Sequence, residues 1–252
     1  MADATYDWDA IVNGLNQYLH LRSIPIGMKL FATVEEMEAI PKIRRPKAKH
    51  TTDQIVAQAR QLGWTVGVTM ADLVGPQCGA VIGLHPQDDE WLSGKTMAGV
   101  WFKTVEDSAA HQRAMDCVPY GRYRAMAVSP LTSGRLDPPD VCLIYGTPGQ
   151  MILFINGLQW TGYKKLSFTS VGESACADSW GKALKNGRAC ADDSLLRRTA
   201  LRRGCRRRAA DGDSATLPVG RDSRSRGAQP QRASLSDSAV WDSERRGSRA
   251  RR

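Results

Sequence analysis

The chain has 252 residues, a length that suits one large domain or two small ones. Its 35 Lys+Arg exceed its 26 Asp+Glu, and the resulting net charge of +9 at first suggests a polyanionic partner such as nucleic acid. The excess is not evenly spread, because residues 188–252 hold 17 Arg, no Lys and 8 acidic residues. Residues 1–187 are therefore neutral, and we expect no specific nucleic-acid partner for them.

The sequence carries no signal for export or membrane insertion. Its first residues, MADATYDWDAIVNGL, lack the basic and then apolar pattern of a secretory signal peptide. No apolar run reaches the ~18 residues that a membrane-spanning helix needs. The 6 cysteines form no CxxC pair and no disulfide framework. We expect a cytoplasmic protein with reduced thiols and no membrane partner.

The first part of the chain predicts a helix, a strand and a second helix. Residues 10–21 place apolar side chains at helical spacing, and residues 23–31 are typical of a buried strand. Thr51 and Gln54 fit a capping box at the start of the next helix, which Gly63 closes.

The middle of the chain predicts mostly strands. Apolar runs indicate strands at residues 64–69, 78–84, 97–102 and 122–131, and residues 105–115 have the pattern of a helix. These elements alternate closely, with short polar connections between them.

The clearest unit is a strand, a tight turn and a helix in the last third of the neutral region. Residues 141–145 form a continuous apolar run, typical of a strand that is buried on both faces. Thr147 can cap the following helix, Pro148 occupies its favoured first position, and Gln150 completes a second capping box. Residues 151–155 are apolar on nearly every side and predict a deeply packed helix.

This alternation predicts an α/β or α+β fold, with a single domain over residues 1–187 and a mixed sheet flanked by helices. Residues 188–252 contain no Ile, Phe, Tyr, Met, Asn, Lys or His and show no periodicity. Such a composition cannot offset the entropy of ordering, so we expect a disordered Arg-rich tail.

The tail also has the character of an out-of-frame translation. Residues 206–211 can be encoded by CGA CGA CGA GCT GCT GAT, and the same bases read one position later spell DDELL. The same shift permits YAERRYGGVA over residues 196–205 and RNGLRYPIPPYGIQ over residues 230–243. We therefore predict a one-base frameshift near Gly187, which resequencing would test. The alternative is a natural tail that binds RNA or membrane phosphates.

Four stretches of the neutral region resemble one known family. They are SIPIGMKLF (23–31), PQCGAVIGL (76–84), the segment from VSPL to DPPDVCLIYGTPGQ (128–150) and ESACADSWGKALKNG (173–187). Together they resemble domain of unknown function 169, an uncharacterised archaeal and bacterial family, over about residues 5–187. The shifted readings of the tail are similar to how that family continues.

The resemblance implies a soluble family domain with no established activity. It matches Cys78 and Cys176 to family cysteines. A further family cysteine falls where this chain has Thr51 and Thr52, and another lies in the part lost from this frame. The resemblance therefore implies that two recurring thiols are missing from this translation.

Two thiols are the strongest candidates for chemistry. Cys78 lies just before the strand predicted at residues 78–84, and Cys176 lies at a predicted helix start. A thiolate is favoured at a helix N-terminus, so these residues predict a metal, iron–sulfur or thiolate site. The alternative is that both are small buried hydrophobic residues. His85, at the end of the same strand, is the best acid–base candidate.

The turn before the helix at residue 148 is a second candidate site. Gly146, Thr147, Gly149 and Gln150 present backbone N–H groups at a helix start, where a carboxylate or phosphate can bind. The turn lacks the Lys-Ser/Thr of a nucleotide-binding loop. A well-capped structural turn is the alternative interpretation.

The leading functional hypothesis is a cysteine-dependent small-molecule enzyme that uses Cys78 and Cys176, either as ligands of a metal or iron–sulfur cofactor or as thiolates. The second is a non-catalytic ligand- or cofactor-binding protein that uses the turn at residues 146–150. Nucleic-acid binding through the basic tail is the least favoured. The sequence leaves the substrate, the reaction, the metal and any oligomer open.

Overall fold

The structure is a computed structural model that describes residues 6–160, 162–163, 165–166, 169–186, 190–191 and 199–202. All of these residues belong to one compact unit, Met1–Leu217, and a second unit, Pro218–Arg252, lies outside the described residues. None of the helices in the described part of the chain is long and apolar enough to cross a bilayer.

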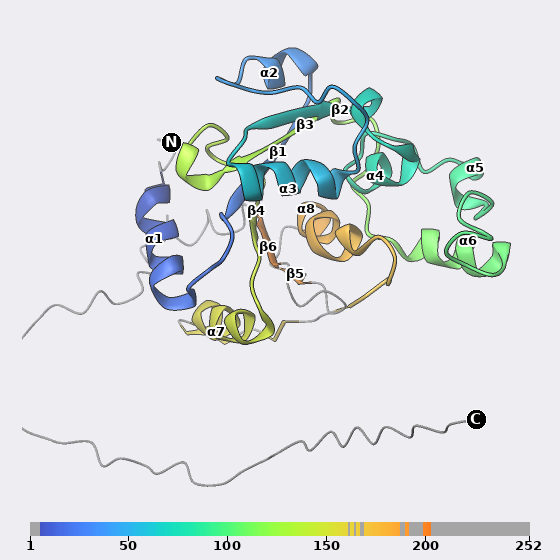
Figure 1. The fold of residues 1–252 in the computed structure, drawn as a ribbon. Coiled ribbons are helices and arrows are strands. Elements are labelled where there is room, and N and C mark those ends of the chain that lie inside the picture. Colours follow the sequence, from blue (N-terminus) through green and yellow to red (C-terminus); the bar gives the residue numbers. More distant parts are fainter. Residues whose placement is uncertain are drawn as a thin grey trace, which may run out of the picture. The chain divides into compact units, whose positions relative to one another are not determined.

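A sheet with the strand order β2-β3-β1-β4-β6-β5 forms the centre of the unit (Figure 1). β1 lies inside the sheet and pairs with β3 on one side, where Ile26 faces Pro130, and with β4 on the other. The strands are β1 (Ile26–Phe31), β2 (Val66–Thr69), β3 (Ala125–Pro130), β4 (Val141–Ile144), β5 (Cys190–Ala191) and β6 (Thr199–Arg202).

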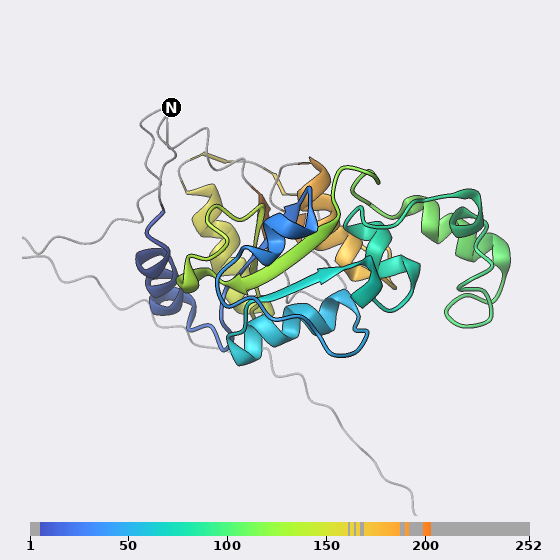
Figure 2. The same cartoon turned by 90° about the horizontal axis from the view of Figure 1, so that it is seen from above.

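Helices surround this sheet, so the predicted class, an α/β domain with helices flanking a sheet, is confirmed. They are α1 (Trp8–Leu19), α2 (Val34–Glu38), α3 (Thr52–Leu62), α4 (Gly75–Val81), α5 (Asp89–Leu92), α6 (Val105–Ala114), α7 (Pro148–Gln159), a π-helical turn (Ala177–Gly181) and α8 (Lys182–Asn186). In Figure 2, α5 and α6 extend away from the sheet on the side of α4.

The prediction of a mixed sheet is wrong. Every pairing between the named strands is antiparallel. Parallel contacts occur only as isolated bridges in the described residues, such as Arg44 with Val66 and His50 with Leu73. The alternation of helices and strands indicated parallel neighbours, but β1 lies between β3 and β4, and each of them runs opposite to it.

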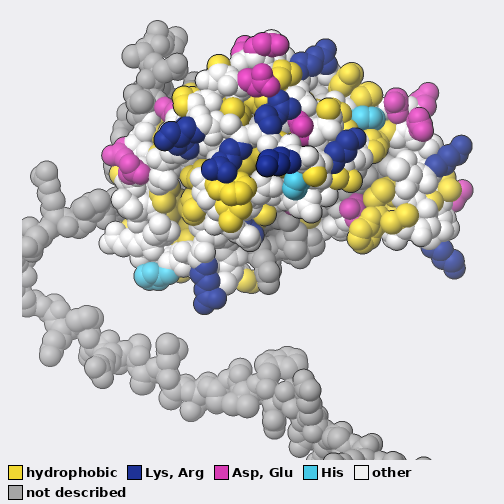
Figure 3. Space-filling model, turned by 45° about the horizontal axis from the view of Figure 1, so that its top comes forward, with side chains coloured by type: hydrophobic (Ala, Val, Ile, Leu, Met, Phe, Trp, Pro, Cys, Tyr) yellow, Lys and Arg dark blue, Asp and Glu magenta, His cyan; other side chains and the backbone are white. Residues whose placement is uncertain are grey.

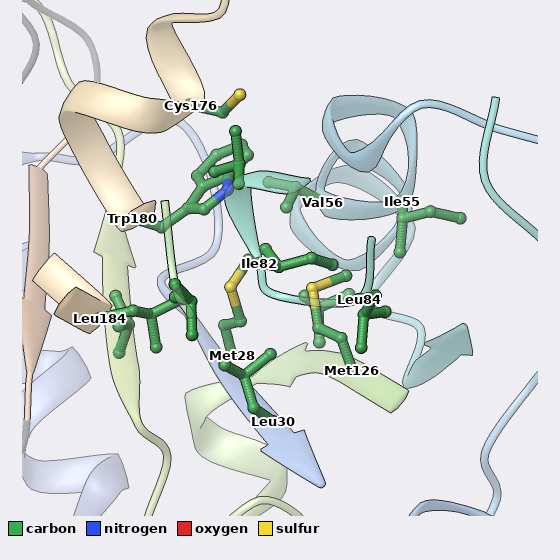
Figure 4. Packing of buried hydrophobic residues seen from close by; sticks show 14 of the residues in the cluster. Met28, Leu30, Ile55, Val56, Ile82, Leu84, Met126, Cys176, Trp180 and Leu184 are labelled. Atoms are coloured by element: carbon green, nitrogen blue, oxygen red, sulfur yellow. The ribbon is translucent and has the colours of Figure 1, made fainter. Parts of the chain in front are cut away.

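The two faces of the sheet bury different side chains because successive residues of a strand point to opposite sides. Met28 and Met126 point toward α3, α4 and the C-terminal helix, where Trp180 is fully buried (Figure 4). Phe31 packs on the other face with Met37 of α2. The main core therefore lies beneath α3, α4 and α8.

Both predicted capping boxes are confirmed. Thr51 Oγ1 accepts the N–H of Gln54 at 3.2 Å, and Gln54 Oε1 accepts the N–H of Thr51 at 2.9 Å. Thr147 and Gln150 make the same reciprocal pair at the start of α7. Gly63 closes α3 with a φ of 69°.

The strand expected at residues 78–84 is instead the helix α4 followed by a turn, so Cys78 lies inside a helix. Pro76 stands in the first helical turn, where its missing N–H costs little. The N–H of Leu84 donates to the carbonyl of Gly79 at 2.9 Å and ends the helix. A short apolar run does not by itself distinguish a buried strand from a buried helix.

The strand expected at residues 97–102 is also absent. This segment consists mainly of turns, and Gly94 and Gly99 both have a φ of 77°. Val100 and Trp101 are 70% and 62% exposed. The glycines reverse the chain where the apolar pattern alone suggested an extended run.

The expectation of a deeply packed α7 is wrong for part of that helix. Met151 and Phe154 are buried against Leu19 and Ile144, but Ile152 and Leu153 are 60% and 56% exposed. One face of α7 packs on α1 and β4. The opposite face, with Ile152 and Leu153, packs against no other element among the described residues.

Most of residues 188–252 lie outside the described residues, and so do the shifted-frame stretches at residues 206–211 and 230–243. The described exceptions are β5 and β6, and β6 lies within the shifted-frame stretch at residues 196–205, where the composition predicted no ordered element. β6 pairs with β4, with Val141 facing Arg202, and β5 pairs with β6. The frameshift near Gly187 stays a prediction.

Candidate functional site

Hydrogen bonds join α4 to the turn that precedes the C-terminal helix. Gln77 Nε2 donates to the carboxylate of Glu173 at 2.9 Å and to the hydroxyl of Ser174 at 2.5 Å. Ser174 Oγ also donates to the Glu173 carboxylate. Cys78 follows Gln77 directly, and Cys176 lies two residues after Ser174. The structure therefore brings together the two segments that carry the predicted thiols. We call the contact of Gln77 with Glu173 and Ser174 the junction.

The two thiols differ in exposure. Cys78 is partly exposed and packs against the main core, and its carbonyl accepts a hydrogen bond from Thr52 Oγ1 at 3.4 Å. Cys176 is only 6% exposed and starts the helix that also carries Trp180 (Figure 4). The helix start predicted at Cys176 is confirmed, but of these two thiols only Cys78 is partly exposed.

Ser174 adopts a backbone conformation that is rare for residues other than glycine. Its φ is 63°, and its carbonyl accepts the N–H of Ala177 at 2.8 Å. Non-glycine residues in this region cost about 1–3 kcal/mol and persist where surrounding contacts fix them. Here the contacts with Gln77 and Glu173 hold the side chain of Ser174 at the junction.

His111 of α6 completes the junction, and sequence reasoning gave it no role beyond the surface. It is 7% exposed, and its Nε2 donates to the backbone carbonyl of Glu173 at 2.9 Å. The ring of Phe102 lies 4.7 Å from the His111 ring, centroid to centroid. The one available signal in the sequence was its spacing of four residues from the apolar Met115, which follows the end of α6 and is buried.

His85 lies at the other end of α4. A Cβ placed on Gly79 would lie 3.0 Å from the Cβ of His85, so this histidine is close to the helix position that follows Cys78. The Nδ1 of His85 is 2.7 Å from the carbonyl oxygen of Pro86 and donates to it. A neutral His85 ring therefore keeps Nε2 as a proton acceptor.

Cys117 lies in the same core cluster but does not provide a thiolate. Burial raises the pKa of its thiol to about 12, and the cation of Lys185 offsets this only in part. Cys117 therefore stays protonated at neutral pH and acts as a small hydrophobic residue.

The described residues do not fit a metal or iron–sulfur centre built from the predicted ligands. In the part of the chain that the structure describes, no group of three or more His, Cys, Asp or Glu side chains is placed to hold a metal ion. Cys78 and Cys176 together supply two ligands, and structural metal sites usually have four.

The predicted turn at residues 146–150 uses its polar groups for structure. Gln150 Oε1 accepts the N–H of Thr147 at 2.7 Å, and Gln150 Nε2 donates to the carbonyls of Leu19 and His20 at 2.6 and 2.9 Å. Thr147 and Gly149 are exposed, and Gly146 is partly buried. The side chain of Gln150 thereby ties α7 to the end of α1, on a different side of the domain from α4 (Figures 1 and 2).

Charged side chains of both signs occur on the face in Figure 3. Arg45 pairs with Glu38 at 2.7 Å and with Asp72 at 2.5 Å. The guanidinium of Arg44 lies over the ring of Trp64, 4.4 Å from its centroid. These arginines are already engaged by partners within the chain.

The comparisons with known proteins give a family match. The model of the family DUF169, described as uncharacterised ArCR, matches residues 14–206. This range contains α4, α6, the turn at Glu173 and both predicted thiols, and it extends beyond Gly187. No curated protein and no solved structure matches the chain. Because the match spans well over half of the sequence, the chain belongs to the DUF169 family.

Proposed function

We propose that this protein is a small-molecule enzyme whose reactive group is the thiol of Cys78. The observation that carries the proposal is the pair of hydrogen bonds from Gln77 to Glu173 and Ser174. They hold a carboxylate and a hydroxyl beside a segment that presents a partly exposed thiol. A thiol with a nearby proton acceptor is the general arrangement for nucleophilic catalysis by cysteine.

Each residue of the junction has a distinct role in this proposal. Glu173 accepts the proton of the Cys78 thiol, and the amide of Gln77 holds its carboxylate in place. His85, with Nε2 free to accept a proton, is the second candidate for this step. Cys176 is buried and is not the reactive group in this proposal.

The predicted ligand site at residues 146–150 and the predicted metal centre remain proposals, and both are less favoured than the thiol site. A ligand- or cofactor-binding role for the turn at residues 146–150 is less favoured because α1 engages the Gln150 amide. A metal or iron–sulfur centre needs ligands beyond those that the described residues bring together. We further propose a cytoplasmic location and a small-molecule partner, with no specific nucleic-acid or membrane partner.

Alkylation of the full-length chain by iodoacetamide, followed by peptide mass spectrometry, tests the proposal. Cys78 is expected to react about tenfold faster than Cys142, which is also partly exposed and serves as the internal control. Glu173→Gln should slow the labelling of Cys78, because a neutral amide is a poor proton acceptor. Glu106→Gln, an exposed change on α6, should leave it unchanged. Equal labelling of Cys78 and Cys142 would refute a reactive Cys78.

A further inference from the structure

The inner face of α6 carries three buried polar side chains that are not fully satisfied. Ser108, His111 and Gln112 are 0%, 7% and 1% exposed. Ser108 Oγ, His111 Nδ1 and both amide atoms of Gln112 have no hydrogen-bond partner in the described part of the chain. Their spacing of three and four residues places all three on one face of the helix.

Such a group is unusual in a native protein. Most buried side-chain polar atoms have at least one partner, because leaving a donor or acceptor unpaired costs its full desolvation. Gln112 alone leaves both a donor and an acceptor unpaired. Packing alone would favour an apolar side chain at this position, so the polar atoms are suited to a partner that comes from outside the chain.

Neighbouring elements cover this face next to the turn that carries Glu173. Trp91 of α5 is also buried with an unpaired Nε1. α5 and α6 are closely packed, since a Cβ on Gly94 would collide with the backbone of Ala109. The ring of Phe102 covers His111, whose Nε2 reaches the carbonyl of Glu173.

We propose that Ser108, His111 and Gln112 form a binding subsite for a small uncharged molecule that carries both hydrogen-bond donors and acceptors, such as a primary carboxamide. The subsite lies against the turn that carries Glu173, so it names the substrate class of the proposed thiol site and rests on the proposed function to that extent.

The chemistry of the free atoms defines this ligand class. Because His111 Nε2 donates to a carbonyl, its Nδ1 is an acceptor in the neutral ring and takes a ligand N–H or O–H. Gln112 offers one acceptor and one donor, which can pair with an amide in two parallel bonds. Ser108 donates or accepts, and the Trp91 indole only donates. None of these groups has a fixed charge, so the set favours a neutral molecule over an anion.

Thermal unfolding of the full-length chain with matched probes tests the proposal. Acetamide and nicotinamide should raise the Tm by about 3 °C at ten times their dissociation constant, whereas acetate and nicotinate should not. Gln112→Leu should abolish this shift. Gln87→Leu, an equivalent change at an exposed position, should keep it.

Gln112→Leu is expected to fold, because an apolar replacement removes two unpaired buried atoms. Ser108→Ala provides a second, smaller change that should weaken the same shift. The proposal is overturned if neither amide raises the Tm, if the anions raise it equally, or if Gln112→Leu retains the shift.

The same assay separates this inference from the proposed function. Cys78→Ser should still be stabilised by nicotinamide if the subsite exists, because Cys78 supplies none of the unpaired atoms. Slow alkylation of Cys78 together with a retained nicotinamide shift would refute the thiol chemistry and keep the subsite. Fast alkylation of Cys78 without any shift of the Tm by nicotinamide would refute the subsite and keep the thiol chemistry.

Discussion

Gln77 and Glu173 lie 96 positions apart in the sequence, and Gln77 Nε2 donates to Glu173 Oε2 at 2.9 Å. This bond connects a short helix on the sheet to the turn that starts the C-terminal helix. It fixes the distance between the two segments that carry Cys78 and Cys176.

Replacing Gln77 with glutamate should separate these two segments. Gln77→Glu puts a carboxylate against that of Glu173 and removes the donor, so we expect a loss of about 1 kcal/mol in the free energy of unfolding. Urea unfolding measures this loss. Gln87→Glu, at an exposed position, is the control and should cost less. An unchanged midpoint for Gln77→Glu would show that the bond does not hold the junction together.

Gly79 has little room for a larger side chain. A Cβ at this position would collide with Met70 Sδ and lie 3.0 Å from the Cβ of His85. Overpacking of this kind costs about 1–3 kcal/mol, so Gly79→Ala should lower the Tm. Gly149→Ala is the matched control because nothing lies within 4 Å of its Cβ, and in a helix alanine is favoured over glycine. Its Tm should stay the same or rise, and equal losses for both variants would contradict the packing at α4.

The buried thiol of Cys117 should make the protein less stable in alkali. In the unfolded chain this thiol ionises near its ordinary pKa of 9.0, whereas in the folded protein the pKa is raised to about 12. The unfolded state therefore releases its proton first, and stability falls as the pH rises from about 9 to about 12. Cys117→Ala should reduce the slope of unfolding free energy against pH in this window. Identical slopes for the two proteins would rule out this contribution.

Local chemistry made the helix ends predictable. The pairs Thr51–Gln54 and Thr147–Gln150 carry their capping geometry within four residues, so the sequence alone locates them. Strands β1, β3 and β4 follow equally from their apolar runs. These features depend on neighbours along the chain and need no knowledge of the fold.

The errors arose where long-range contacts decide the structure. The apolar run after Cys78 fits a strand or a helix equally well, and its packing against the C-terminal helix is visible only in three dimensions. The strand order, which places β1 between two antiparallel neighbours, likewise has no local signature. Gln112 was missed because nothing in its immediate sequence indicates burial, and the spacing of His111 from Met115 is too weak a signal to indicate it.

The pairing of β6 with β4 has a consequence for any shortened form of this protein. β6 occupies the outer side of β4 over Val141–Ile144. A product that stops at Gly187 would uncover that side and leave a row of unpaired amide and carbonyl groups along the edge of the sheet. Open rows of this kind recruit strands from other molecules. Truncation at Gly187 would thus convert an internal strand into a nucleus for self-association, whereas a chain that continues through Arg202 keeps it closed.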